Sequence, residues 1–185
     1  MKNILFFGDS LTAGYGLADA RTESCPALIQ QKINAKGLDY HVINGGLSGD
    51  TTGGGLARLD YWLNRPMDVF VLELGINDIR RRVTPAKIYQ NLEAIVVRVK
   101  AKYPQIRLAL MGMELPAFIP GMVTADFNAI YPKLATNYQM AFLPFYLRGV
   151  AGQRHLNIRD GVHPSAAGYK IIADAVWPVI RPLLV

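Results

Sequence analysis

The fold is indicated first by the stretch Ile4–Gly14, which has the sequence ILFFGDSLTAG. Large apolar residues followed by glycine and a short polar turn are typical of a buried strand that ends abruptly. The turn places the hydroxyl of Ser10 at the C-terminal edge of a sheet, where open α/β proteins bind ligands. Ser10 is therefore either a nucleophile or the N-cap of the following helix, because serine is a favoured N-cap residue. On this stretch alone the N-cap interpretation is slightly favoured.

The rest of the chain alternates between short apolar strands and amphipathic helices. Strands are expected at residues 4–7, 41–43, 68–74, 108–111 and 141–143. Helices are expected at 27–36 with Ser24 as the N-cap, at 56–63, from Thr84 and Pro85 onwards, at 125–135 and after 164. Such alternation implies a parallel sheet with right-handed crossovers. We find no domain boundary, internal repeat or low-complexity tract. The sequence predicts an α/β protein: a single three-layer α/β/α domain over residues 1–185, with a five-stranded, mostly parallel sheet.

Composition and charge limit the classes of protein to consider. Of the 185 residues 51% are hydrophobic and 18% are charged, which is typical of a globular protein and not of a disordered chain. The net charge of +6 is moderately basic, but Arg80–Arg82 is the only tight basic cluster and no nucleic-acid-binding module accompanies it. We therefore expect no nucleic-acid partner, and a charge that favours solubility and attracts anionic substrates or surfaces.

A lone cysteine, Cys25, excludes an internal disulfide and a multi-cysteine metal site, and we expect it to be a buried small hydrophobe. No apolar stretch reaches the ~20 residues of a transmembrane helix, so stable membrane insertion is not expected. Strand-like residues begin almost at Met1, which leaves no room for a signal peptide. We expect a cytoplasmic protein, or a periplasmic or secreted one whose leader is missing from this sequence. The oligomeric state is left open.

Polar, glycine-bearing segments follow four of the predicted strands. Ser10 follows the first strand, Gly49 the second and Asn77 the third, while Asp160 and His163 come after the fifth. The C-terminal ends of parallel strands face one edge of the sheet, so these segments are expected to meet there. That convergence favours the nucleophile interpretation of Ser10 over the N-cap interpretation.

These residue types suit acyl transfer. A serine hydroxyl is a poor nucleophile until a base takes its proton, and the imidazole of His163 is the candidate base. Asp160, three residues earlier, can accept the Nδ1 hydrogen and stabilise the imidazolium. The backbone N–H groups of Ser10 and Gly49 and the side-chain amide of Asn77 are candidate donors to the oxyanion. A single such donor contributes on the order of a hundred- to a thousand-fold in rate.

Four blocks of the chain resemble those of the SGNH (GDSL) hydrolases, in the family's order. They are Gly8–Leu11 (GDSL), Ser48–Thr51 (SGDT), Gly75–Asp78 (GIND) and Asp160–His163 (DGVH). The resemblance implies a flavodoxin-like sheet and hydrolysis of esters or thioesters without metal or cofactor. It also implies the roles given above for Ser10, Gly49, Asn77 and His163.

Several linking stretches resemble the bacterial branch of thioesterase I, lysophospholipase L1 and arylesterase. They are Gly55–Leu59, Glu114–Ala117, Ile130–Ala135 and Leu143–Phe145. Two positions depart from that branch. It usually has Trp where this chain has Cys25, and a Leu-Arg-Gly-like turn where this chain has Arg80–Arg82. Because that turn borders the acyl site in the branch, substrate range is where we expect this chain to differ.

Other polar groups have simpler interpretations. His41 and His155 are expected to be an edge-strand and a solvated loop residue, and Thr51 and Thr52 to make turn and helix-cap bonds. Asp9 and Asp78 are expected to bond loop backbone groups. The glycine-rich stretch from 45 to 55 lacks the Gly-Lys-Ser/Thr ending of a phosphate loop and the spacing of a dinucleotide fingerprint.

Apolar residues flanking the blocks are the candidate lining of an acyl pocket, since ligand sites are commonly apolar with a few placed polar groups. They are Ile76, Ile79, Leu115, Pro116, Phe118 and Val162. We hypothesise a serine esterase that hydrolyses small esters with short to medium acyl chains, with thioester or lysophospholipid activity as further options. The alternatives are a carbohydrate O-acetyl esterase, disfavoured by the apolar flanks, and a non-catalytic binding module, disfavoured by the complete catalytic set.

Overall fold

A parallel sheet forms the middle layer of the computed structural model, which describes residues 1–115 and 122–185. The strand order is β2-β1-β3-β4-β5, and every neighbouring pair is parallel. The strands are β1 (Lys2–Gly8), β2 (Tyr40–Gly46), β3 (Val69–Glu73), β4 (Arg107–Met111) and β5 (Ala141–Leu143). This is the order of flavodoxin-like doubly wound folds, which confirms the expected architecture.

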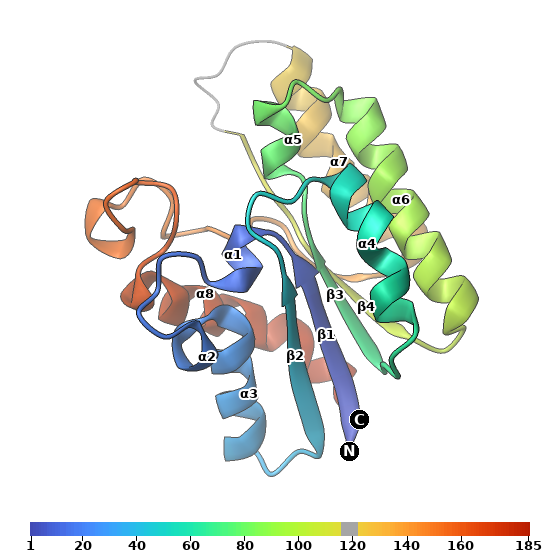
Figure 1. Ribbon diagram of the computed structural model, residues 1–185, viewed down its shortest axis with the longest axis vertical. Helices are drawn as coiled ribbons and strands as arrows, with labels where there is room; N and C mark the ends of the chain where they lie inside the picture. Colours follow the sequence, from blue (N-terminus) through green and yellow to red (C-terminus); the bar gives the residue numbers. More distant parts are fainter. Residues whose placement is uncertain (116–121) are drawn as a thin grey trace.

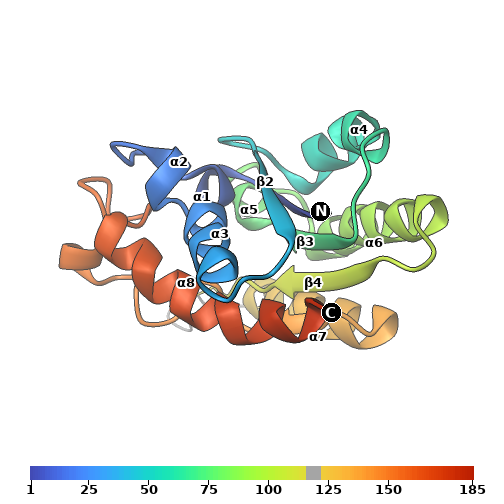
Figure 2. The ribbon, with the colours of Figure 1, turned by 90° about the horizontal axis from the view of Figure 1, so that it is seen from below.

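Two helical layers cover the sheet (Figure 1). On one face α3 (Cys25–Ala35) packs against α8 (Ala166–Ile180), and on the other α6 (Pro85–Lys102) packs against α4 (Thr52–Leu63) and α7 (Met122–Tyr138). Figure 2 shows the sheet between these layers. The short helices are α1 (Ser10–Ala13), α2 (Ala20–Glu23), α5 (Ile76–Arg80) and the 3₁₀ turns η1 (Arg154–Leu156) and η2 (Arg181–Leu183). None of the helices described is long and apolar enough to cross a membrane.

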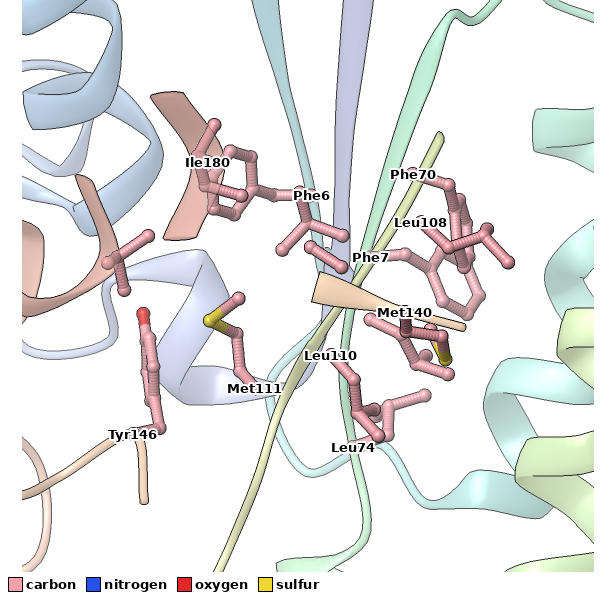
Figure 3. Close-up of a cluster of buried hydrophobic side chains, with 14 of the residues drawn as sticks. Phe6, Phe7, Phe70, Leu74, Leu108, Leu110, Met111, Met140, Tyr146 and Ile180 are labelled. Atoms are coloured by element: carbon pink, nitrogen blue, oxygen red, sulfur yellow. The ribbon is translucent and has the colours of Figure 1, made fainter. Parts of the chain in front are cut away.

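Central strand β1 explains why the opening stretch is apolar without interruption. Its side chains alternate between two covered faces, so both sets are buried. Phe6 points towards Ile180 of α8, whereas Phe7 lies on the opposite side, 5.6 Å between ring centroids from Phe70 (Figure 3). Burial of both faces therefore excludes the alternating pattern of a half-exposed strand.

The predicted helix starts are confirmed for α3 and α6. Ser24 caps α3 by accepting a hydrogen bond from the N–H of Ala27, and Thr84 caps α6 by accepting one from Lys87. The predicted start of α4 at residue 56 is wrong, because the helix begins at Thr52. The helix therefore includes Gly55, whose lack of a side chain allows close packing on the sheet. A Cβ on Gly55 would lie 2.5 Å from Leu74.

Two other elements, β2 and α7, are longer than expected. β2 runs to residue 46 instead of 43, and α7 spans 122–138 instead of 125–135. In β2 the extra residues include Gly45 and Gly46, which are disfavoured in strands but pair in register with Phe7 and Gly8 of β1. Tertiary pairing overrides local preference at this end of the strand.

Cys25 is fully buried at the start of α3. Burial raises the pKa of its thiol to about 12. A thiol that stays protonated is a poor nucleophile, so the expectation of a buried small hydrophobe is confirmed.

Candidate active site

The predicted site lies where the strand order reverses direction. The chain runs from β1 outwards to β2 and then returns to β3 on the other side of β1. Ligands bind at such switch points in doubly wound sheets, beyond the C-terminal ends of the strands. Ser10 follows β1 and Asn77 follows β3, so neighbouring strands carry both residues to this crevice.

Ser10 is the first residue of α1, directly after β1. The N-cap of this helix is Asp9, whose Oδ1 accepts a hydrogen bond from the N–H of Leu11 at 2.9 Å. The N-cap interpretation of Ser10 is therefore wrong, because the preceding residue already caps the helix. The Ser10 side chain faces His163 instead, with 2.9 Å between Oγ and Nε2.

His163 completes a hydrogen-bonded chain with Asp160. Its Nδ1 lies 2.6 Å from Asp160 Oδ2, and Asp160 Oδ1 accepts hydrogen bonds from the backbone N–H groups of Val162 (2.9 Å) and His163 (3.0 Å). The backbone bond from His163 is the largest cause that lowers the pKa of Asp160, to about 2. Asp160 is therefore a carboxylate at neutral pH and can stabilise a protonated imidazole.

The turn that carries these two residues is fastened to the preceding loop. The N–H of Ile158 donates to the His163 carbonyl at 2.8 Å. The side-chain amide of Asn157 donates to the carbonyls of Val150 and Gln153, each at 2.8 Å. A loop held at several points can keep the imidazole in hydrogen-bond reach of a serine far away in the sequence.

Two backbone N–H groups predicted to bind the oxyanion, those of Ser10 and Gly49, have no acceptor among the described residues. Gly49 has φ +78°, and a Cβ there would meet nothing within 4 Å. Its left-handed backbone, not a lack of space, is therefore the reason for glycine at this position.

The amide of Asn77 is already engaged. Its Nδ2 donates to Asp9 Oδ2 at 3.0 Å and to the Asp50 carbonyl at 2.9 Å. Asn77 is thus bonded to Asp9 and Asp50, which are the sequence neighbours of Ser10 and Gly49. To bind an oxyanion, the Asn77 amide would share one of its two hydrogens with Asp9 or Asp50. These two bonds fix the orientation of the amide.

Similarity to known proteins extends over the segments that carry these residues. The model of the GDSL-like lipase/acylhydrolase family matches residues 6–171. The chain belongs to this family. Among its relatives, esterase TesA of Pseudomonas aeruginosa is 35% identical over 99% of this chain and 90% of its own length. Thioesterase 1/protease 1/lysophospholipase L1 of Escherichia coli K12 is 36% identical over 98% of this chain and 84% of its own.

Solved structures of GDSL-like proteins share the fold. The crystal structure of TesA aligns with 99% of this chain and 100% of its own, with a TM-score of 0.91 and 35% identity. The esterase EstA from Pseudoalteromonas, in a structure inhibited by monoethylphosphonate, aligns with 100% of this chain and 99% of its own, with a TM-score of 0.88 and 30% identity. The flavodoxin-like sheet is therefore that of known GDSL-like esterases.

Glu73, which the sequence reasoning did not identify, contacts Asp9 and Thr12 in the segment that carries Ser10. Its Oε2 accepts hydrogen bonds from Thr12 Oγ1 at 2.7 Å and from the N–H of Asp9 at 3.4 Å, while its buried Oε1 has no acceptor or donor partner in the described residues. Burial, and then the neighbouring Asp9, raise the pKa of Glu73 well above its usual value. The signal for this residue is a glutamate inside an otherwise apolar strand.

Asp9 is the partner of Glu73 and is also buried. Burial is the largest cause that raises the pKa of Asp9, to about 7. Two adjacent buried carboxyl groups disfavour double ionisation, and Glu73 is the member that keeps its proton. Asp9 also bonds Leu11 and Asn77, so the structural role expected for it is confirmed.

Arg58 fastens the second block of this GDSL-like site and was also missed. Its guanidinium donates to Asp50 Oδ2 at 2.6 Å and to the carbonyls of Gly45 and Gly8, each at 2.9 Å. One planar group thus ties the ends of β1 and β2 to the loop that carries Gly49. An arginine within a predicted amphipathic helix gives no sequence signal of this role.

The third block is tied to the second by Asp78. Its carboxylate accepts hydrogen bonds from the N–H of Thr52 at 2.8 Å and from the Thr52 hydroxyl at 2.7 Å. Thr51 caps α4 through a bond from the N–H of Gly54. The helix-cap role expected for Thr51 is confirmed, and Asp78 bonds a backbone group as expected. The Thr52 hydroxyl instead bonds the side chains of Asp78 and Asn91. Among the residues described, no group of histidine, cysteine and carboxylate side chains is arranged to hold a metal ion.

The predicted acyl-pocket residues differ in how far they are buried. Ile76 and Ile79 of α5 are half-buried, and Leu115 is buried, with its N–H donating to Asn128 Oδ1 at 2.8 Å. Val162 is exposed beside His163. Two further candidates lie outside the described residues: Pro116 and Phe118. The pocket lining stays a prediction.

Proposed function

We propose that this GDSL-like protein is a serine esterase that hydrolyses carboxylic esters through an acyl-enzyme on Ser10. The observation that carries the proposal is the chain of hydrogen bonds from Ser10 Oγ to His163 Nε2 (2.9 Å) and from His163 Nδ1 to Asp160 Oδ2 (2.6 Å). This is the geometry of a nucleophile, a general base and an orienting carboxylate.

The reaction follows from these distances. His163 Nε2 takes the hydroxyl proton as Ser10 Oγ attacks the acyl carbon, and Asp160 stabilises the imidazolium. The N–H groups of Ser10 and Gly49 and the amide of Asn77 stabilise the oxyanion. The acyl carbon–oxygen bond then breaks, and His163 returns its proton to the departing alcohol. Water, activated by the same imidazole, hydrolyses the acyl-enzyme.

The substrate range is proposed from the surroundings and the relatives. Half-buried Ile76 and Ile79 next to Asn77 favour acyl chains of short to medium length. The related proteins are named as esterase and as thioesterase and lysophospholipase, which supports ester hydrolysis with thioesters and lysophospholipids as further substrates. A panel of 4-nitrophenyl esters tests this range. Faster hydrolysis of chains longer than octanoate than of acetate to octanoate would reject it.

A fluorophosphonate probe separates the esterase from a non-catalytic binding module. The probe is expected to label the wild-type protein covalently and to leave the Ser10→Ala variant unlabelled. Absence of labelling in a folded wild-type protein would overturn the proposal. Release of acetate from acetylated xylan, faster than hydrolysis of 4-nitrophenyl butyrate, would instead identify a carbohydrate O-acetyl esterase.

A further inference from the structure

Three large apolar side chains remain exposed around the catalytic residues. Tyr15, Leu47 and Val162 are 51%, 52% and 58% exposed. We call these three residues the apolar rim. Exposed apolar side chains need no explanation singly, but a group of them beside a reactive centre is typical of a binding surface.

Each member of the apolar rim is tied to the site by a contact. The ring of Tyr15 lies 4.7 Å from the imidazole of His163, centroid to centroid, and the N–H of Tyr15 donates to the Ser10 carbonyl at 3.0 Å. The N–H of Leu47 donates to the Gly8 carbonyl at 3.0 Å. Val162 immediately precedes His163 in the turn. The apolar rim is thus built into the segments that carry the triad and Gly49.

The apolar rim and helix α5, which carries the acyl-pocket candidates Ile76 and Ile79, lie on opposite sides of Ser10. Val162, which the sequence analysis placed in the acyl pocket, is exposed next to His163 and is assigned here to the apolar rim. Helix α1, which leads into Tyr15, packs against β2, whose end leads into Leu47, while α5 with Ile76 and Ile79 follows β3 on the other side of β1. Figure 1 shows α1 and the orange segment before α8 on one side of β1, and α5 on the other. The crevice therefore has two different halves.

The chemistry assigns a part of the ester to each half. In acylation the bond between the Ser10 oxygen and the acyl carbon forms, the bond to the alcohol oxygen breaks, and His163 Nε2 gives its proton to that oxygen. The alcohol must therefore lie on the side of the imidazole, and the acyl chain on the other side. The ring of Tyr15 lies against this imidazole, and Val162 immediately precedes His163 in the chain.

We infer that Tyr15, Leu47 and Val162 form the subsite for the alcohol portion of the substrate, and that this subsite selects esters of apolar, especially aromatic, alcohols. The inference rests on the proposed esterase function. The Tyr15 ring offers a face for stacking, and the two aliphatic side chains offer apolar area that water otherwise covers.

The test compares two esters of one acid: benzyl butyrate and 2-methoxyethyl butyrate. Their alcohols are similar in acidity, and both esters form the same butyryl-enzyme. The value of kcat/KM reports the acylation step, so the ratio of the two values reports recognition of the alcohol. We expect the wild-type enzyme to favour the benzyl ester on the order of tenfold.

Variants assign the preference to the apolar rim. Leu47→Ser, Val162→Ser and Tyr15→Ala are each expected to lower the ratio about threefold, while Tyr15→Phe keeps it because the ring is retained. Tyr61→Ala is the control, since Tyr61 is 58% exposed but lies near the far end of α4. It is expected to leave the ratio unchanged.

Three results would overturn the inference: no benzyl preference in the wild type, a ratio unchanged in all the rim variants, or rim variants that change acyl-chain preference at fixed alcohol. In each of these cases an active, fluorophosphonate-labelled enzyme leaves the proposed function intact. An inactive and unlabelled wild-type protein would instead remove the proposed function.

Discussion

At the scale of single residues, Gly8 has no room for a side chain. A Cβ there would lie 2.1 Å from Thr12 Oγ1 and 2.6 Å from the Glu73 carbonyl oxygen. Gly8→Ala is therefore expected to lower the free energy of unfolding by about 1–3 kcal/mol or more, measured by urea denaturation. Gly53→Ala is the control. Its nearest neighbour would be 3.6 Å away within α4, so this variant is expected to gain about 0.5–1 kcal/mol. Equal stability of the two variants would contradict the packing account.

Arg82 occupies a backbone position that favours glycine. It has φ 59° just after α5. Its N–H donates to the Ile79 carbonyl, and the N–H of Val83 donates to the Asp78 carbonyl, each at 3.0 Å. This is a helix-ending motif that usually carries glycine. Arg82→Gly is expected to raise the free energy of unfolding on the order of 1 kcal/mol.

Gln139 has the same backbone conformation as Arg82 and provides a matched comparison. Gln139 follows α7 with φ 52° and the same pattern of bonds, so Gln139→Gly is expected to stabilise the protein similarly. Chemical denaturation of both variants measures the effect. A loss of stability in Arg82→Gly but not in Gln139→Gly would show that the arginine side chain makes a stabilising contact.

Asp9 makes stability depend on pH in an unusual direction. Burial raises its pKa from 3.8 to about 7, so the folded state holds a proton in this range that the unfolded state releases. The contribution of Asp9 to stability is therefore present below about pH 4 and is lost as the pH rises to about 7. Asn cannot ionise and still caps a helix. The melting temperature of Asp9→Asn minus that of the wild type is expected to increase from pH 4 to 8. A constant difference would contradict the raised pKa.

At the scale of elements, Arg58 joins the ends of two strands to the Gly49 loop. Arg58→Lys keeps a positive charge near Asp50 but cannot bond both carbonyls as well, so it is expected to lower the free energy of unfolding by about 1–3 kcal/mol and to lower kcat. Arg98→Lys is the matched control, because Arg98 pairs with Asp60 on the exposed side of α6. It should change stability by less than ~0.5 kcal/mol. Equal losses in both variants would refute the fastening role.

The same elements show where sequence reasoning succeeds and fails. The cap at Ser24 and the strand of large apolar residues before Gly8 are local signals, and both were predicted correctly. The start of α4 was not, because helix over Gly53–Gly55 depends on bonds from Thr52 to Asp78 and on close packing under Leu74. Such bonds join residues far apart in the sequence, and no local pattern reveals them.

At the scale of the whole molecule, strand alternation predicts a parallel sheet, and the resemblance to SGNH hydrolases implies its flavodoxin-like order. Alternation alone leaves the order open, because it does not say on which side of β1 each new strand is added. Convergence of Ser10, Gly49, Asn77 and His163 follows from parallel strands. The buried pair of Asp9 and Glu73 could not be predicted in the same way, since burial depends on packing from both helical layers.

In the proposed mechanism Ser10 carries the acyl group during turnover. The most direct measurement is mass spectrometry of peptides after rapid acid quenching of a reaction with 4-nitrophenyl butyrate. We expect a butyryl adduct on the peptide that contains Ser10, and neither adduct nor turnover in the Ser10→Ala variant. An adduct on another hydroxyl, such as that of Ser48 or Thr51, or undiminished turnover by Ser10→Ala, would contradict it.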